Sequence, residues 1–193
     1  MILSKKDYKI WREADRISLG VSKNSINIMR NEIYLFEIRL RKLELAINCS
    51  KNRIRILYRK MLYKKSSIKL GYSISPNTFG PGLSIAHRGT IVVNGGARIG
   101  SNCRIHVDVN IGTTPGKDSS APVIGDNCYI GPGAKIFGPI KIGPNTVIGA
   151  NAVVGSDFPK GYQTIAGVPA QVISGKSSDG MLVKGFPVIS PTK

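Results

Sequence analysis

Aliphatic side chains recur every six residues through the second half of the chain. Ile or Val occupies ten such positions, and glycine follows directly at seven of them. One interval is longer than the others: thirteen residues separate Ile111 from Ile124, which is one hexad plus an insertion of seven. The ten positions are Val93, Ile99, Ile105, Ile111, Ile124, Ile130, Ile136, Ile142, Ile148 and Val154.

A hexapeptide period predicts a parallel β-helix, in which each hexad forms one short strand and one corner. The aliphatic side chain points inward and stacks on its counterpart in the next coil. Asn lies two residues after several of the glycines and suits tight corners, because it tolerates left-handed backbone angles. We therefore expect a mainly β domain over residues 71–175, with a loop at 113–122 and a tail over 176–193.

Residues 1–70 carry a helical pattern instead. The sequence DYKIWREADRISLG predicts a short helix that stops at Gly20. Apolar residues at three- and four-residue spacing predict a second helix, and a third is expected over about 51–65. The predicted apolar faces are Met29, Ile33, Phe36, Leu40, Leu43 and Ile47 in the second helix, and Ile54, Leu57, Tyr58, Met61 and Leu62 in the third.

The net charge of +17 is concentrated in this α-helical extension, which holds 18 Lys and Arg against 6 Asp and Glu. The basic side of the third helix allows two functional interpretations: peripheral contact with an anionic membrane surface, or attraction of an acidic polymer. The simpler interpretation is a packed helix with a solvated charged face. No nucleic-acid motif accompanies the charge, so nucleic acid is not an expected partner.

The chain lacks a run of twenty apolar residues, and its start, MILSKKDYKIW, lacks the apolar core of a signal peptide. We therefore expect a cytoplasmic protein, located at the inner face of the cell membrane if the basic helix binds lipid. Three cysteines do not make a disulfide framework. Cys103 and Cys128 are expected to be small core residues rather than redox or metal groups.

The two histidines of the chain, His87 and His106, are the main candidates for a base near neutral pH. They are nineteen residues apart. Residues one coil apart lie on the same edge of a β-helix, within roughly 5–8 Å given the strand spacing. The inserted loop leaves the β-helix a few residues after His106. The pair beside this loop therefore indicates a functional site.

The run IAHRGTIVVNGGARIG, the sequence AGVPAQVI near residue 170 and the hexads resemble the serine acetyltransferases. More narrowly, the chain is similar to the short members of that family found in bacterial capsule and exopolysaccharide assembly. The resemblance covers about residues 70–175 and implies a left-handed β-helix with three hexads per coil, a rare exception to right-handed crossovers. About four coils then fit between Ile74 and Val154.

The resemblance also implies a homotrimer with acetyl-CoA as cosubstrate in the groove between subunits, and no metal. Whether trimers pair stays open. His87 aligns with the family's general base, a role that typically contributes about 10²–10⁴-fold to the rate. His106 is then a second base, an acceptor contact or the group that positions His87. A backbone N–H near the loop would stabilise the oxyanion.

The chain departs from the amino-acid enzymes at the residues that contact serine. The acid before the histidine is Ala86, the Arg-His pair before Pro122 is Ser120-Ala121, and the Asp that orients the imidazole aligns with Ser73. A carboxylate without a cationic partner is costly to bury. A neutral polyhydroxyl acceptor therefore fits better, and the acceptor contacts are expected from Ser73, Ala86, Asn110, Thr113 and Thr114.

The family's acetyl-CoA contacts align mostly with small residues, which let the pantetheine arm lie close. Each glycine among them is also expected to serve as a corner residue of the coil. The basic residue that often follows the GVPA turn is Gln171 here, which leaves the partner of the 3′-phosphate open. The expected cofactor-binding residues are Gly131, Pro132, Gly149, Ala150, Gly155, Ser156 and Gln171.

The resulting prediction is an acetyl-CoA-dependent O-acetyltransferase that acts on a hydroxyl of a sugar or polysaccharide precursor. The alternative within the same class is the serine O-acetyltransferase of cysteine biosynthesis. A zinc enzyme of the γ-carbonic-anhydrase kind would need three histidine ligands, and each chain has two. A non-enzymatic scaffold is the remaining alternative, and it predicts no binding of acetyl-CoA.

Overall fold

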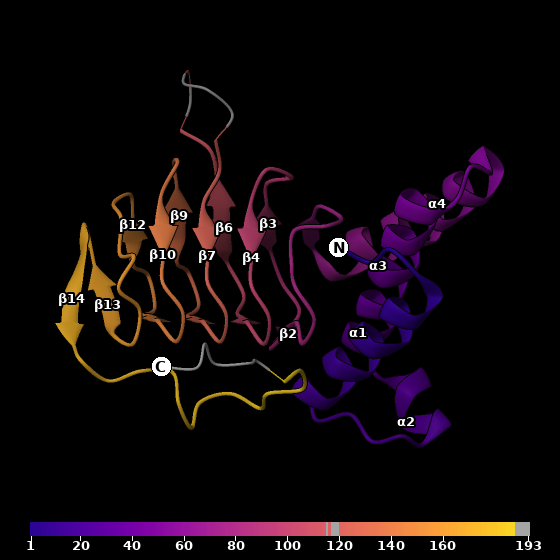
Figure 1. Ribbon diagram of the computed structural model, residues 1–193, viewed down its shortest axis with the longest axis horizontal. Coiled ribbons are helices and arrows are strands. Elements are labelled where there is room, and N and C mark those ends of the chain that lie inside the picture. Colours follow the sequence, from indigo (N-terminus) through magenta and orange to yellow (C-terminus); the bar gives the residue numbers. More distant parts are fainter. Residues whose placement is uncertain (115, 117–119, 188–193) are drawn as a thin grey trace.

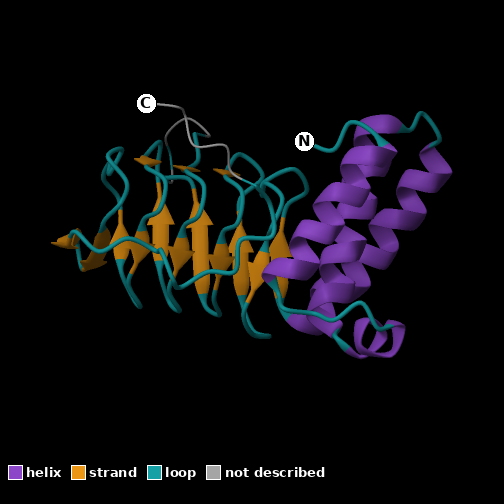
Figure 2. Ribbon diagram, turned by 60° about the horizontal axis from the view of Figure 1, so that its bottom comes forward, coloured by secondary structure: helices purple, strands orange, loops and turns teal. Residues whose placement is uncertain are grey.

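The computed structural model describes residues 1–114, 116 and 120–187. Within these residues, four helices come first along the chain and short strands follow. The helices pack together at one end of a stack of coils (Figures 1 and 2). The helices are α1 (Lys5–Ser18), α2 (Ser25–Arg30), α3 (Glu32–Cys49) and α4 (Arg53–Leu70).

The strands wind into three sheets, which we name A, B and C. Each coil crosses them in the order A, B, C, and successive coils pair in parallel. Sheet A contains β1 (Tyr72–Ile74), β3 (Ile91–Val93), β6 (Val109–Gly112), β9 (Lys135–Phe137) and β12 (Val153–Val154). Sheet B contains β4 (Arg98–Ile99), β7 (Val123–Ile124) and β10 (Lys141–Ile142).

Sheet C ends in a hairpin that closes the far end of the stack. Its last two strands pair antiparallel, whereas the others are parallel. The hairpin therefore covers the last coil at the end opposite the helices (Figure 1). The strands of sheet C are β2 (Ser84–Ile85), β5 (Arg104–Ile105), β8 (Tyr129–Ile130), β11 (Val147–Ile148), β13 (Thr164–Gly167) and β14 (Ala170–Ser174).

The aliphatic residues of the hexads form the core, as the period predicted. In sheet C the register places them in one buried column, Ile85, Ile105, Ile130, Ile148 and Ile165. Because each is at most 1 % exposed, every coil contributes its full apolar side chain to a continuous core.

The corner between sheets B and C is built on the predicted asparagines. Asn102, Asn127 and Asn145 have φ values of 53°, 55° and 55°. Their buried side chains form a ladder in which each amide donates to the next, over 3.1 and 3.2 Å. Cys103 and Cys128 stack beside this ladder as buried free thiols, with 3.5 Å between the Cys128 backbone N and the Cys103 Sγ, which confirms their expected place in the core.

Charged side chains of the helices bind the exposed backbone of the first coil. Arg41 is fully buried and donates to the carboxylates of Asp15 and Glu44 and to the carbonyl oxygens of Phe79 and Gly80. Asp15 in turn accepts from two backbone N–H groups of the coil, at 2.8 and 2.9 Å. The helical extension therefore satisfies hydrogen-bonding groups that no further coil covers.

Burial alone would lower the pKa of Arg41, but the Asp15 and Glu44 carboxylates raise it above its usual value. Burial, and then the Asp15 carboxylate, raise the pKa of Glu37 well above its usual range. Glu37 accepts from the Ile85 N–H with one carboxyl oxygen, and its other oxygen is buried without a partner among the described residues. Glu37 is therefore held in its neutral form in this network.

The C-terminal segment 176–187, which we call the strap, returns along the asparagine corner toward the helices (Figure 1). Ser178 bonds to the backbone of Asn127 and Asn145, and Phe186 exchanges two hydrogen bonds with the Asn102 side chain. The Gly185 N–H reaches Ser18 of α1 at 3.1 Å. The strap thus joins the last coils to the first helix, whereas residues 188–193 of the predicted tail lie outside the described residues.

The helices differ from the prediction in two respects. The second predicted helix is interrupted at Asn31, whose side chain accepts from the Tyr34 N–H and begins α3, so that Met29 lies in α2 and is exposed. The third runs on to Leu70 and ends at Gly71, where φ is +80°. Its predicted apolar face points into solvent except at Leu62, which is half-buried, because α4 packs on α3 and the first coil through another side.

Candidate functional site

Both histidines lie at the corner where sheet C turns into sheet A, which we call the histidine corner. His87 follows β2 and His106 follows β5, one coil further along the stack. The Ala86 N–H donates to the Ile105 carbonyl at 3.0 Å, so Ala86 is level with His106 and His87 is one residue beyond. The two ring centroids are 6.0 Å apart, within the predicted range.

Two tyrosines that the sequence analysis did not single out support this pair. The ring of Tyr129 lies 4.9 Å from that of His106, on the side of the next coil. The Tyr72 hydroxyl donates to the His87 carbonyl oxygen at 2.9 Å and fixes the backbone there. The register could have revealed Tyr129, because it pairs with Arg104, two residues before His106.

His106 is partly enclosed by these neighbours. Burial lowers its pKa below the ordinary value for histidine, and the positive charge of Arg104 and the His87 ring lower it further. Its Nε2 atom is buried without a hydrogen-bond partner in the described part of the chain. His106 is therefore neutral near pH 7 and has an unused polar atom, which suits a positioning or hydrogen-bonding role better than a cationic one.

The imidazole of His87 is exposed at the corner, and none of the described residues hydrogen-bonds to it. Arg88, the next residue, pairs with Glu32 of α3 at 3.0 Å. Ser73 lies on the outer face of sheet A and makes no described hydrogen bond with His87. The orientation of the candidate base is therefore supported through its backbone, by Tyr72.

Most of the predicted acetyl-CoA residues lie along the histidine corner. The corner continues from His106 through Gly131 and Gly149. The His106 N–H donates to the Ile130 carbonyl at 3.2 Å, and the N–H groups of Gly131 and Gly149 each donate to the next coil at 2.8 Å. Exposed or half-buried small residues follow at Pro132 and Ala150. Gln171 pairs with Ala166 at the end of the same line.

The glycines of this line are also required by the fold. A Cβ on Gly131 would lie 2.8 Å from the Ala150 nitrogen, and one on Gly149 would lie 2.7 Å from the Ala166 Cβ. The prediction that these glycines serve as corner residues of the coils is therefore confirmed. Gly155 and Ser156 lie elsewhere, after β12 at the corner between sheets A and B.

The predicted acceptor residues are spread across sheet A. Ala86 is beside His87. Ser73 and Asn110 face outward from sheet A, and each lies beside Val92 of the strand between them, because Val92 pairs with both. Thr113 and Thr114 begin the inserted loop at the far end of β6. Within one chain the loop and the histidines therefore lie at opposite edges of sheet A, which differs from the expected proximity.

Part of the predicted loop 113–122, namely residue 115 and residues 117–119, lies outside the described residues. Its described residues follow β6 at the corner between sheets A and B. Ala121, which replaces a charged residue of the serine enzymes in the resemblance above, is 9 % exposed. It therefore presents no charge at the base of the loop.

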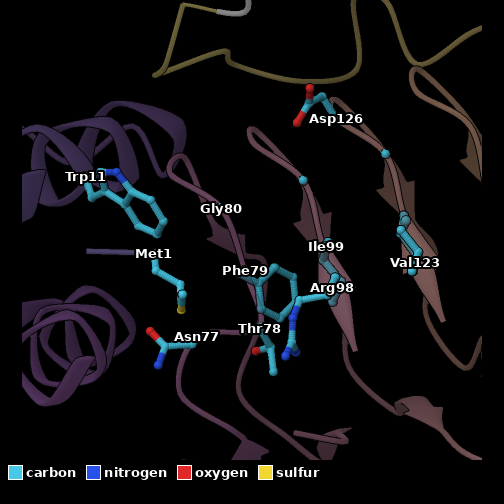
Figure 3. Close-up of a pocket in the computed structure, with 13 residues that line it drawn as sticks. Met1, Trp11, Asn77, Thr78, Phe79, Gly80, Arg98, Ile99, Val123 and Asp126 are labelled. Atoms are coloured by element: carbon cyan, nitrogen blue, oxygen red, sulfur yellow. The ribbon is translucent and has the colours of Figure 1, made fainter. Parts of the chain in front are cut away.

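A hollow of about 450 Å³ lies elsewhere, between the helices and sheet B. Figure 3 shows Trp11 and Met1 on one side of it and Arg98 and Val123 on the other. Neither histidine lines this hollow, so it is separate from the candidate site. Among the described residues, no cluster of three or more His, Cys, Asp or Glu side chains could hold a metal ion.

The repeats of this chain match those of known proteins. The family model described as bacterial transferase hexapeptide (six repeats) matches residues 121–156. The serine acetyltransferase of Synechococcus elongatus is 37 % identical over 117 residues, which cover 59 % of this chain and 47 % of that protein. The Staphylococcus epidermidis enzyme is 38 % identical over 126 residues, or 64 % of this chain and 58 % of the relative.

Residues 121–156 carry transferase hexapeptide repeats, and the chain is similar in sequence to the serine acetyltransferases. It spans about half the length of the curated relatives it matches. The crystal structure of the Brucella abortus serine acetyltransferase superposes with a TM-score of 0.73 at 25 % identity, over 90 % of this chain and 72 % of the other. A serine acetyltransferase solved in complex with CoA gives 0.71 at 25 % identity, over 88 % and 71 %.

These hexapeptide-repeat relatives confirm the predicted fold, a left-handed β-helix preceded by a helical region. The superposition covers the helices as well as the coils, because it extends over nine-tenths of the chain. No helix among the described residues is both long and apolar enough to cross a membrane.

Proposed function

We propose that this protein is an acetyl-CoA-dependent O-acetyltransferase with His87 as its general base. The neutral imidazole takes the proton of an acceptor hydroxyl while the hydroxyl oxygen attacks the thioester carbonyl. The C–S bond then breaks, the imidazolium gives the proton to the CoA sulfur so that CoA leaves as a thiol, and the acceptor carries a new ester. The observation that carries this proposal is an exposed histidine on a corner that continues into small residues.

The histidine corner fits the acetyl-CoA assignment for a steric reason. Gly131, Pro132, Gly149 and Ala150 follow the histidines coil by coil, and none has a side chain long enough to block a thioester arm. Relatives whose structures contain CoA share the fold. Gly155 and Ser156 would join this surface only if a second subunit contributed them.

Two acceptors are supported by different observations. The names of the relatives favour L-serine, the substrate of a serine acetyltransferase. The local residues favour a sugar hydroxyl. Ala86 and Ala121 supply no charge to bind the ammonium or carboxylate group of serine, and the charge of Arg88 is already paired with Glu32. The comparisons weigh more heavily for serine, and the assay below separates the two.

We also propose a homotrimer. Sheet A separates the histidine corner from the inserted loop within one chain, and a threefold arrangement could bring the loop of one subunit beside the histidines of the next. Light scattering that gives about three times the 20.8 kDa chain mass would support this state. An active monomer would contradict it, and about six times the chain mass would indicate paired trimers.

The deciding experiment follows the release of CoA thiol from acetyl-CoA with L-serine or with a panel of sugars and oligosaccharides. His87→Ala should lower kcat by about 10²–10⁴-fold with the true acceptor. Lys141→Ala, an exposed change on sheet B, serves as the matched control and should leave the rate unchanged.

The outcomes separate the parts of the proposal. Full activity of His87→Ala would remove His87 as the base. Turnover with serine at a kcat/KM of about 10⁴–10⁸ M⁻¹s⁻¹, the usual enzyme range, would select the serine alternative and set aside the argument from Ala86 and Ala121. No thiol release with any acceptor, together with no thermal stabilisation by CoA, would contradict the enzyme itself.

A further inference from the structure

One side of α4 exposes large apolar side chains. Ile54, Leu57, Met61 and Ile68 are 81 %, 68 %, 59 % and 73 % exposed, and Tyr58 is half exposed. Their spacing places them on one side of the helix, with Lys65 between Met61 and Ile68, and we call these five apolar residues the apolar stripe. Exposing large apolar side chains to water is energetically unfavourable, so a row of them on the surface indicates a binding surface.

The stripe is not part of the helical bundle. α4 packs on α3 and β1, and its buried residues are Ser66, Ser67 and Leu70. Those positions lie on the opposite side of the helix from Ile54 and Met61, given about 100° per residue. Figure 1 shows the beginning of α4 projecting away from the coils, and none of the described residues buries this part of the stripe.

Cationic side chains lie on both sides of the stripe and, at Lys65, within it, and α4 contains no acid. Among the described residues, Lys69 is the one cation of α4 that pairs with a carboxylate, that of Glu32. The remaining charges are available to an anionic surface. The seven cations are Arg53, Arg55, Arg59, Lys60, Lys64, Lys65 and Lys69.

We propose that α4 docks the protein onto an anionic lipid bilayer. The stripe would enter the boundary between headgroups and acyl chains, while the flanking Lys and Arg side chains extend to the lipid phosphates. A helix that carries an apolar line between two cationic flanks matches both layers of such a surface. Tyr58 has the amphipathic ring that is enriched at membrane interfaces.

Charge argues for a bilayer over other occupants. Two copies of α4 packed face to face would bring fourteen cations together without an acid from either helix, and like charges at such distances repel. A soluble polyanion would neutralise the cations but leave the stripe in water. An anionic bilayer satisfies both features at once.

A second apolar surface adjoins the same helix. A hollow of about 450 Å³ between α3 and α4 is lined by Leu43, Ile47, Ile56, Tyr63 and Pro76, with Lys60 and Lys64 also in its lining. Lys60 and Lys64 each lie three residues from the stripe positions Leu57 and Met61. The apolar area offered to lipid therefore extends beyond the stripe itself.

The test is cosedimentation of the full chain with vesicles of phosphatidylcholine alone or with about one-third phosphatidylglycerol added. The protein should bind the anionic vesicles at least about tenfold more strongly, and salt of about 0.5 M should weaken this binding.

Leu57→Asn with Met61→Asn should reduce binding to the anionic vesicles about tenfold or more while all charges remain. Lys64→Gln with Lys65→Gln should reduce it by about fivefold for each charge removed.

The matched control is Ile26→Asn with Met29→Asn, which removes two equally exposed apolar side chains from α2. It should bind as the unchanged protein does. Circular dichroism and thermal melting of each variant establish that the fold is retained.

Three results would overturn the proposal: no binding of the unchanged protein to anionic vesicles, full binding by the Leu57/Met61 variant, or equal loss in the α2 control. A smaller particle mass for the Leu57/Met61 variant, without vesicle binding by the original, would assign the stripe to a second copy instead. The proposal does not depend on the acetyltransferase assignment, because the readout is binding and not turnover.

Discussion

The His106 side chain is partly enclosed, whereas that of His87 is exposed. Its ring lies between those of His87 and Tyr129, and its Nε2 atom is enclosed. The sequence placed it one coil from His87 but could not show the burial, which depends on the Tyr129 ring from the next coil. The sequence likewise could not show that Tyr72 fixes the His87 backbone.

An imidazole titration should reveal the enclosure of His106. Since burial, Arg104 and His87 lower the pKa of His106, its ring should titrate below about 6.5, the ordinary value. NMR of the imidazole C–H protons would measure this directly. The chain has two histidines, so His106→Gln leaves one signal and assigns both.

The same shift affects stability. The unfolded chain binds the proton more readily than the folded one, so the contribution of His106 to the free energy of unfolding is complete above about pH 6.5. It is lost as the pH falls through the lower folded pKa. The His106→Gln variant should therefore lose less stability on acidification, and titration of His106 at or above the ordinary value would contradict its enclosure.

At the scale of elements, the strands were predictable and the helix contacts were not. The hexads gave inward positions such as Ile105 and Ile130, because a repeat constrains every coil alike. In the extension, propensity did not reveal the break at Asn31, where a local cap competes with a continuous helix. Nor did an apolar face on α4 guarantee packing, since spacing alone does not say whether a partner is present.

The junction between helices and coils depends on one buried carboxylate. Asp15→Ala would leave Arg41 with one fewer anionic partner and leave the Gly82 and Leu83 N–H groups unpaired. The free energy of unfolding should fall by about 3–5 kcal/mol, the usual cost of removing one partner of a buried ion pair. Urea denaturation followed by circular dichroism would measure it.

Glu13→Ala is the control on the same helix. Glu13 pairs with Arg16 and Lys23 near the surface, so its loss should cost below about 1 kcal/mol. Equal effects of the two substitutions would show that the buried network does not hold the helices on the first coil.

At the scale of the molecule, a stack of coils is normally held together only by neighbouring repeats. The strap adds contacts between segments that are far apart in sequence, such as Gly185 with Ser18. Neither composition nor the hexad period predicted this path, because its hydrogen bonds go to backbone and side-chain groups at the asparagine corner.

Removing the strap should destabilise the whole chain. Truncation after residue 175 removes the five hydrogen bonds that Ser178, Gly185 and Phe186 make, and it should lower the free energy of unfolding by about 5 kcal/mol, at roughly 1 kcal/mol for each net hydrogen bond. Truncation after residue 187 is the matched control, since it removes no contact that the structure describes. Identical denaturation curves for both truncations would show that the strap does not stabilise the fold.

The strap also ties the permitted size of the protein to the length of its C-terminal segment. Each additional coil would move the hairpin of β13 and β14 about 4.8 Å further from α1. An extended chain covers at most about 3.3–3.6 Å per residue, so the segment would need one or two more residues to reach Ser18. Duplication or deletion of a whole coil is therefore expected to be tolerated only when this segment is lengthened or shortened to match. The length of the segment thus limits the number of coils.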